Sequence, residues 1–188
     1  MKNCILLLLT AIFFVNCGGP EPRKPVKVTS GSFFKESVER NKELLAQEEK
    51  AMQKLIERDS ANEYVHSSTG SWYYYETRNE QDEYTPQPDD LVSLTYALMT
   101  FEGDTIYSQD EIGVFQYKVD KQELFPGLRN SVKLLKEGET AVFLFPSSLG
   151  FGYHGDNNKI GVNVPLKARV TLLKIEEQHE NVDEIESE

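Results

Sequence analysis

Prolines and glycines divide this chain into one long uninterrupted segment and a series of shorter ones. Residues 33–59 contain neither, and Glu, Lys, Gln, Leu and Ala dominate there, a composition that favours a helix. The expected helix spans residues 33–60. From Gly70 onward prolines and glycines recur throughout, so only shorter elements can follow this helix.

The later segments are rich in aromatic and β-branched residues, which favour strands. One short helix is expected among them, over residues 127–135 and ending before Gly138. Because neighbouring strands are close in sequence, we expect an α+β protein: a largely antiparallel sheet with the short helix on one face, preceded by an N-terminal amphipathic helix. The expected strands are residues 71–76, 91–101, 114–119, 140–145 and 165–175.

The first sixteen residues have the pattern of a signal peptide. Lys2 precedes an apolar run over residues 5–15, which is about half the length that a membrane-spanning helix needs. Cys17 follows at the expected cleavage point, so the stretch resembles a bacterial lipoprotein lipobox and predicts lipid attachment to Cys17. The alternative is an ordinary cleaved signal with an incidental cysteine.

The segments at the two ends of the processed chain are expected to form no packed structure. Residues 17–32 contain Pro20, Pro22 and Pro25 and little apolar surface, so they predict an extended, lipid-anchored tether. Residues 177–188 are predicted to be an acidic, unstructured tail.

The acidic composition excludes some partners. The net charge is −11, and removing residues 1–16, which contain Lys2 and no acid, leaves 19 basic against 31 acidic residues. Nucleic-acid binding is not expected, because phosphate contacts require basic patches. Cys4 would leave with the signal peptide, so the processed chain could form no internal disulfide.

The apolar stripe of the long helix leaves two interpretations open. Val38, Leu45 and Met52 recur every seven residues, but the stripe is too sparse to indicate a coiled coil by itself. The helix could dock on its own domain, or it could pair with a second copy to form a homodimer. Sedimentation with and without the helix distinguishes the two.

Four segments of the second half have a joint spacing that is more specific than any one of them. They are ELFPGL at 123–128, LLKEGE at 134–139, FPSSLGFG at 145–152 and the strand at 165–175. Together they resemble the signature of the FKBP family of peptidyl-prolyl cis-trans isomerases. PDDLVSLTY at 88–96 also resembles the family strand that ends in a pocket tyrosine, and residues 103–108 resemble its next turn and strand.

The resemblance implies an FKBP-like domain over residues 70–176, with the sheet wrapped around the short helix, and an apolar pocket for substrate. The backbone N–H of Phe125 would face the substrate carbonyl. Without the spacing match, such an aromatic set would be interpreted as ordinary core. The implied catalytic residues are Tyr96, Tyr107, Phe125 and Phe151, and the implied substrate-binding residues are Ser108, Phe115, Leu124, Leu128 and Ile160.

Four positions depart from the family pattern. Ser108 stands where the family usually has an aspartate, and Phe151 stands where a tyrosine hydroxyl normally donates to the substrate carbonyl. Leu128 replaces a tryptophan at the pocket floor, and Ala168 replaces a phenylalanine of the wall. These departures predict a weakened enzyme with a wider or differently filled pocket.

The implied reaction is rotation about an X-Pro bond in an apolar pocket that removes water from the imide, which needs no nucleophile. No cofactor is expected. No metal site is expected either, because His66, His154 and His179 have no cysteine or carboxylate at ligand spacing. The expected partners are proline-containing polypeptides, and the membrane through lipidated Cys17.

Three functions remain open. The first is an isomerase for exported proteins, lipid-anchored in the cell envelope on the outer membrane and facing the periplasm. Its lipobox, acidic helix and divergent domain resemble the gliding-motility-associated FKBP lipoproteins of Bacteroidota. The second is a chaperone or proline-binding module that keeps the fold without useful turnover. The third is a structural lipoprotein whose helix pairs with a copy or another partner.

Overall fold

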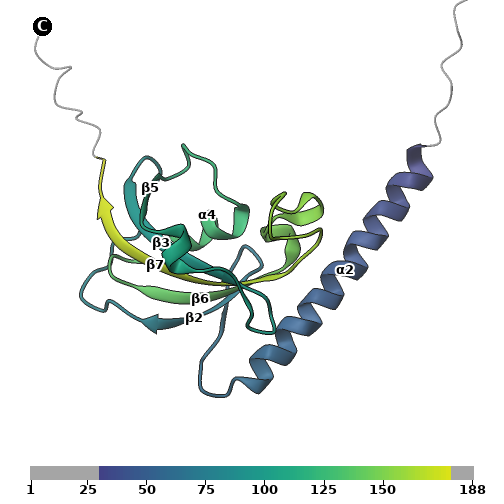
Figure 1. The fold of residues 1–188 in the computed structure, drawn as a ribbon, viewed down its shortest axis with the longest axis horizontal. Helices are drawn as coiled ribbons and strands as arrows, with labels where there is room; N and C mark the ends of the chain where they lie inside the picture. Colours follow the sequence, from purple (N-terminus) through teal and green to yellow (C-terminus); the bar gives the residue numbers. More distant parts are fainter. Residues whose placement is uncertain (1–29, 179–188) are drawn as a thin grey trace, which may run out of the picture. The chain divides into compact units, whose positions relative to one another are not determined.

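The computed structural model describes residues 30–178 (Figure 1). The expected signal peptide, Cys17, most of the tether and the tail beyond residue 178 lie outside the described residues. Two compact units make up the chain, Met1–Ser37 and Val38–Glu188. The larger unit holds every strand of the described sheet.

The long helix α2 spans Ser30–Arg58, so it begins three residues before the expected 33–60 and ends two residues before its end. Within the larger unit, Met52 is only 1% exposed. The helix also contacts the domain through Glu48, whose carboxylate accepts a hydrogen bond from the N–H of Ser147 at 2.9 Å. Pairing with a second copy stays a prediction.

No helix among residues 30–178 combines the length and the apolar composition that crossing a bilayer requires.

Seven strands of the described residues pair into one sheet in the order β1-β2-β6-β7-β3-β4, with β5 paired to β3. Every pair is antiparallel, which confirms the predicted α+β class and antiparallel sheet. The last strand among the described residues, β7, lies between β6 and β3, so it joins the two halves of the sheet. The strands are β1 Val65–His66, β2 Trp72–Thr77, β3 Leu91–Met99, β4 Thr105–Tyr107, β5 Phe115–Lys118, β6 Thr140–Phe145 and β7 Leu166–Glu176.

The expected single internal helix is helix α4, Pro126–Val132, which ends three residues earlier than predicted. The prediction of one helix was incomplete, because a second helix, α3, spans Gln109–Ile112. It is only four residues long and buries no side chain, so it leaves no apolar periodicity in the sequence. Two short 3₁₀ helices, η1 at Ser147–Leu149 and η2 at Gly152–His154, follow β6.

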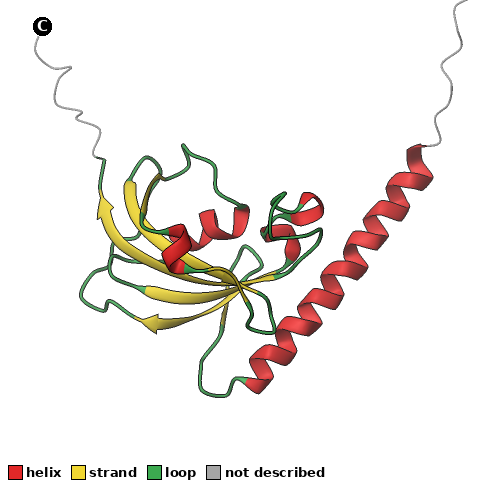
Figure 2. Ribbon diagram, viewed as in Figure 1, coloured by secondary structure: helices red, strands yellow, loops and turns green. Residues whose placement is uncertain are grey.

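The sheet curves around α4, and the main core lies between them (Figures 1 and 2). All six residues of β6 are buried, because this strand lies inside the sheet between β2 and β7. Its alternate side chains Phe143 and Phe145 stack with their ring centroids 5.8 Å apart, and Tyr73 of β2 stacks on Phe143 at 5.1 Å. A row of aromatic rings therefore runs through the core toward α4.

Gly127 allows α4 to lie directly against this row. A Cβ atom at this position would come within 2.8 Å of both the Phe145 ring and the carbonyl oxygen of Leu149. Both contacts are shorter than van der Waals packing permits, so any larger residue must push α4 away from the sheet.

We predict that Gly127→Ala lowers the free energy of unfolding by about 1–3 kcal/mol, the usual cost of adding a methyl group to a filled core. Gly161→Ala is the matched control, because its Cβ would meet only Val164, at 3.8 Å. Urea unfolding followed by the fluorescence of Trp72, the single tryptophan, measures both variants. Equal stability of the two variants would contradict the proposed close contact.

Candidate active site

Four aromatic side chains from separate elements form a continuous cluster beside α4. The ring centroid of Tyr96 on β3 lies 5.9 Å from that of Phe115 and 6.3 Å from that of Phe125, both in edge-to-face geometry. Phe125 lies 5.0 Å from Phe151 in turn. All four are partly buried and pack against the core, so the cluster presents apolar surface on one side and is supported on the other.

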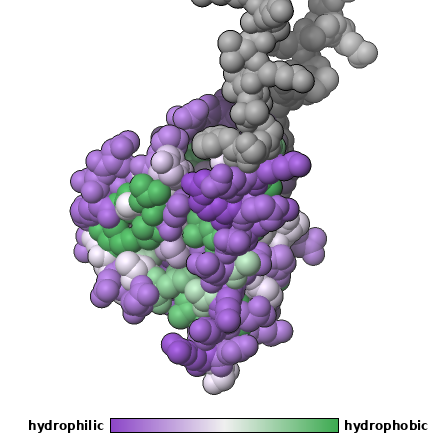
Figure 3. Space-filling model, turned by 90° about the vertical axis from the view of Figure 1, so that its right-hand side faces the viewer, coloured by the Kyte–Doolittle hydropathy of each residue, from purple (hydrophilic) through white to green (hydrophobic). Residues whose placement is uncertain are grey.

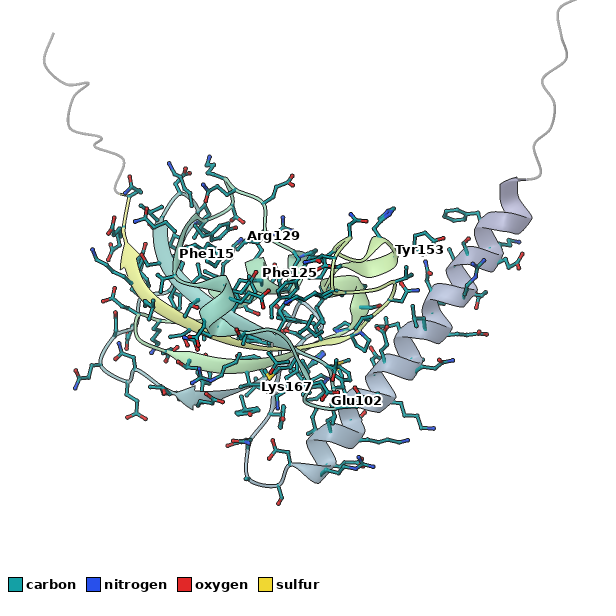
Figure 4. The ribbon with its side chains drawn as sticks, viewed as in Figure 1. Glu102, Phe115, Phe125, Arg129, Tyr153 and Lys167 are labelled. Carbon is teal, nitrogen blue, oxygen red and sulfur yellow. The ribbon has the colours of Figure 1, made fainter. Side chains whose placement is uncertain are left out.

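Phe125 is the centre of this aromatic cluster. Its ring also meets Phe145 of β6 at 5.9 Å, which continues the row of rings from the core. Figure 4 labels Phe125 and its neighbour in the cluster, Phe115. Phe125 has extended backbone angles at the N-cap of α4, and Pro126 after it has the fixed φ that suits a first helical residue. Within residues 30–178, the N–H of Phe125 donates to no other group.

Phe151 is positioned by the two 3₁₀ helices, because it follows η1 and caps η2. The loop after η2 returns closely on itself at Gly155, where φ is +66° and a Cβ atom would lie 2.4 Å from the carbonyl oxygen of Ile160. Only glycine fits both the backbone angle and the contact. The segment that carries Phe151 is therefore fixed at both ends.

Tyr107, at the end of β4, is held by the loop that follows η2. Its hydroxyl donates a hydrogen bond to Asp156, and it accepts one from the side chain of Asn158 at 3.0 Å. The ammonium of Lys159 lies 4.6 Å from the centre of the Tyr107 ring. These contacts join the β3–β4 hairpin to a loop about fifty residues later in the sequence.

Asp156 organises that loop from within. Its Oδ1 accepts hydrogen bonds from the N–H groups of Asn158 and Ile160, each at 2.8 Å. Burial raises the pKa of Asp156, but the hydrogen bonds from Tyr107 and from these N–H groups outweigh burial and hold the pKa below its usual value. The same hydrogen bond to Asp156 raises the pKa of Tyr107. The pair is therefore an ionised carboxylate and a neutral phenol at neutral pH.

The pKa of Tyr96 is also raised, chiefly by burial and then by the neighbouring Tyr107. Its hydroxyl therefore keeps its proton at neutral pH. No hydrogen bond joins that hydroxyl to another group in the described part of the chain. The aromatic cluster thus contains two donors with no partner of their own, the Tyr96 hydroxyl and the Phe125 N–H.

The other predicted site residues lie around the cluster in different roles. Leu124 is partly buried and packs against the core. Leu128 is fully buried and Ile160 is 4% exposed, so both support the site from beneath and offer a ligand almost no surface. Ser108 caps α3, where its hydroxyl accepts a hydrogen bond from the N–H of Glu111 at 3.1 Å. This contact of Ser108 therefore belongs to α3.

The chemistry available at this site is limited to burial and hydrogen bonding. The four rings carry no nucleophile or general base, and no group of three His, Cys, Asp or Glu side chains in residues 30–178 could hold a metal ion. An apolar surface with two unpartnered donors can bind a neutral carbonyl-containing group and remove its water.

Residues 82–173 match the model of the family described as FKBP-type peptidyl-prolyl cis-trans isomerase. This segment is therefore similar to the FKBP family. The match begins before β3 and ends within β7, so it contains all four rings of the aromatic cluster.

Relatives of known name agree with this assignment. A probable FKBP-type peptidyl-prolyl cis-trans isomerase, FkpA, from Neisseria meningitidis serogroup B is 31% identical over 108 residues, which cover 57% of this chain and 39% of that protein. The chain therefore matches well under half the length of this curated relative.

Solved structures show the same fold at lower identity. FkpA from Escherichia coli has a TM-score of 0.57 and 18% identity, and the match covers 94% of this chain and 82% of that one. A peptidyl-prolyl cis-trans isomerase from Pseudomonas syringae pv. tomato has a TM-score of 0.55 and 15% identity, over 72% of this chain and 96% of that one. The predicted FKBP-like fold is confirmed.

The sequence did not identify the residues that stabilise the candidate site through contacts between distant parts of the chain. From the sequence, Asp156 and Asn158 belong only to a polar loop, because their partner Tyr107 is about fifty residues away. A local signal did exist, because an aspartate followed two residues later by asparagine is typical of a turn closed by the carboxylate. Phe145 was expected to be a strand residue, without its contact to Phe125.

We predict that Asp156→Ala speeds amide hydrogen exchange at Ile160 and Asn158 by roughly tenfold or more, because two hydrogen bonds to a charged group are lost. Asp156→Asn should retain most of the protection, since its side-chain oxygen can still accept both bonds. Asp104→Ala, at an exposed turn, is the control.

The stabilisation of the loop by Asp156 should also depend on pH. Because folding lowers the pKa of Asp156 from 3.8, the stabilisation is present above about pH 3.8 and is lost only as the pH falls through the lower pKa of the folded state. Loss of protection already at pH 6 would show that another group holds the loop.

Proposed function

We propose that this chain is a peptidyl-prolyl cis-trans isomerase. The observation that carries the proposal is the cluster of Tyr96, Phe115, Phe125 and Phe151, which is continuous, partly exposed and contained in a segment similar to the FKBP family. Its substrates would be proline-containing polypeptides, because only the X-Pro bond has a cis form that is common enough to need a catalyst.

Desolvation is the proposed source of catalysis. Rotation about a peptide bond has a barrier of about 18–20 kcal/mol, because the twisted state loses amide resonance. The planar amide is more polar than the twisted one and is better solvated by water. An apolar surface that removes this water therefore raises the ground state more than the transition state.

Two donors would hold the substrate carbonyl during the rotation. The N–H of Phe125 and the hydroxyl of Tyr96 both belong to the cluster and have no partner among the described residues. Phe151 contributes only its ring, since it has no hydroxyl. We therefore propose a slower enzyme than a family member with a tyrosine at this position.

A second candidate function is a proline-binding or chaperone module on the same fold. The absence of a hydroxyl at Phe151 favours it, as does the use of Ser108 to cap α3 instead of ordering the aromatic cluster. Such a module would bind proline-containing segments at the four rings with little or no turnover.

We further propose that the protein is exported and lipid-anchored through Cys17, on the outer membrane facing the periplasm. The sequence pattern of residues 1–17 supports this proposal. Newly exported chains have slow proline steps, which take tens of seconds without a catalyst, so they are the proposed clients. Support of gliding motility is part of the proposal and rests on the resemblance to the Bacteroidota lipoproteins.

Two proposals on partners complete this function. Nucleic acid is not a partner, in keeping with the net charge of −11. A homodimer through α2 remains a proposal that an unchanged monomer mass in sedimentation would exclude.

The isomerase proposal predicts opposite effects for two substitutions, measured with a prolyl-peptide isomerisation assay on residues 18–188. Tyr96→Ala should reduce the rate to background, because it removes a ring and a donor. Phe151→Tyr should raise the rate about tenfold, since a donor whose hydrogen bond forms only in the transition-state geometry is worth up to roughly 10²–10³ in rate. Phe101→Tyr adds a hydroxyl outside the cluster and should change nothing.

The result for the natural chain decides between the two functions. A rate above background that Tyr96→Ala abolishes supports the isomerase. No rate in the natural chain, with a gain in Phe151→Tyr, favours the binding module. No rate in any variant would overturn the isomerase proposal.

The anchoring proposal predicts that Cys17→Ser abolishes incorporation of labelled palmitate and releases the protein from the membrane fraction. Cys4→Ser should keep both properties, because Cys4 lies within the proposed signal peptide. Membrane association that survives Cys17→Ser would contradict lipid attachment at this residue.

For motility, deleting the gene in the source organism should abolish surface spreading, and normal spreading would remove that part of the proposal.

A further inference from the structure

A cavity of about 250 Å³ lies between α2 and the segment that carries η1 and η2, all within the larger unit. Leu44, Leu45 and Glu48 line it from α2. Ser148, Tyr153 and Asn163 line it from the domain. Tyr153, which Figure 4 labels, is 73% exposed.

The environment of Glu48 is the unusual feature of this cavity. Its side chain is only 6% exposed. One carboxylate oxygen, Oε2, accepts a hydrogen bond from the N–H of Ser147 at 2.9 Å. The other, Oε1, is buried and has no hydrogen-bond partner among the described residues. A buried carboxylate oxygen without a donor is costly, because it has lost water and gained nothing in return.

Glu48 is also the only charged side chain among the residues that line this cavity. No salt bridge reaches it from the described residues. Glu48 therefore sets the charge of the cavity lining, which favours a cation that can donate hydrogen bonds to Oε1.

The shape and lining of the cavity narrow the choice of cation. Leu44 and Leu45 provide apolar walls for a methylene chain, and Ser148 and Asn163 provide further oxygen acceptors. A calcium ion would need six to eight oxygen ligands and more than one carboxylate, which this lining does not supply. The side chain of lysine is a compact ammonium on a flexible four-carbon stem. Its stem fits the apolar walls, and its ammonium fits the oxygen acceptors.

We propose that this cavity binds a lysine side chain of the polypeptide on which the protein acts, with Glu48 as the residue that recognises the ammonium. Glu48 lines the cavity but its Oε1 is buried, so the proposal requires the Glu48 side chain to rotate when the ammonium binds. Ser147 and Gly152, which line the cavity, lie on either side of Phe151 within one six-residue segment. The cavity and the aromatic cluster therefore share this short segment of chain. The assignment of the lysine to a substrate rests on the proposed function, whereas recognition of an ammonium by Glu48 does not.

Figure 3 turns the α2 side of the molecule toward the viewer. That face is mostly hydrophilic, with smaller hydrophobic patches between the hydrophilic side chains. A polypeptide with charged residues can approach such a hydrophilic surface without a large apolar contact.

The first test uses n-butylammonium as the probe and the purified full-length protein in detergent. Its binding is followed by the amide NMR signals of Ser147, Ser148 and Gly152. We expect saturable shifts with n-butylammonium and none with 1-butanol, which has the same stem without the charge. Glu48→Gln should weaken binding at least tenfold, whereas Glu49→Gln, an exposed neighbour on the same helix, should leave it unchanged.

Glu48→Gln is suited to this test because glutamine keeps an oxygen that can accept the hydrogen bond from Ser147. A melting curve equal to that of the natural chain verifies that the variant is folded. No saturable shift in the natural chain, or equal affinity in Glu48→Gln, would overturn the proposal and leave Glu48 only as a contact between α2 and η1.

The second test asks whether the lysine belongs to a substrate. Proline peptides carrying lysine at successive positions before the proline are compared with the same peptides carrying norleucine, which lacks the charge. We expect one position at which lysine lowers KM at least fivefold in the natural chain and not in Glu48→Gln. Without such a position, the cavity is not a substrate subsite.

The two proposals can fail separately. Binding of n-butylammonium that depends on Glu48, in a chain with no isomerase activity, overturns the proposed function and keeps the cavity. Isomerase activity without any response to n-butylammonium overturns the cavity proposal and leaves the proposed function in place.

Discussion

The close contact of α4 with β6 is the constraint on which the candidate site depends. The backbone of Gly127 lies so near the Phe145 ring that not even a methyl group fits between them. This contact fixes the start of α4, and the start of α4 in turn fixes Phe125, whose ring meets Tyr96, Phe145 and Phe151. One glycine therefore sets the distances within an aromatic cluster to which three other parts of the chain contribute.

A site of this kind is built by packing more than by polar chemistry. Its rings are held by the core on one side, and its polar neighbours Tyr107 and Asp156 bind each other instead of reaching into the cluster. The ionised Asp156 stabilises the loop beside the site and adds no charge to the apolar surface. Such an arrangement suits a reaction in which removal of water lowers the barrier.

The sequence predicted the elements and missed the contacts between them. Strand β6 has the predicted bounds, because its run of buried residues is set by local composition. Helix α3 was missed, since four residues of which none is buried leave no periodic pattern. Tyr96, Phe125 and Phe151 came together as expected because the family spacing fixes them. The pairs Tyr107–Asp156 and Glu48–Ser147 could not be foreseen, as each joins residues that are far apart in sequence through single hydrogen bonds.

The position of β7 has a consequence for how the chain is made. This strand is the last of the described sheet, yet it pairs with β3 on one side and β6 on the other. A chain that leaves the ribosome or a membrane channel from its N-terminus presents β3 and β6 well before the strand that joins them. Tyr96 on β3 and Phe151 beyond β6 therefore lack their shared sheet until β7 has emerged. Until then the sheet stays open between β3 and β6, and the aromatic cluster cannot form.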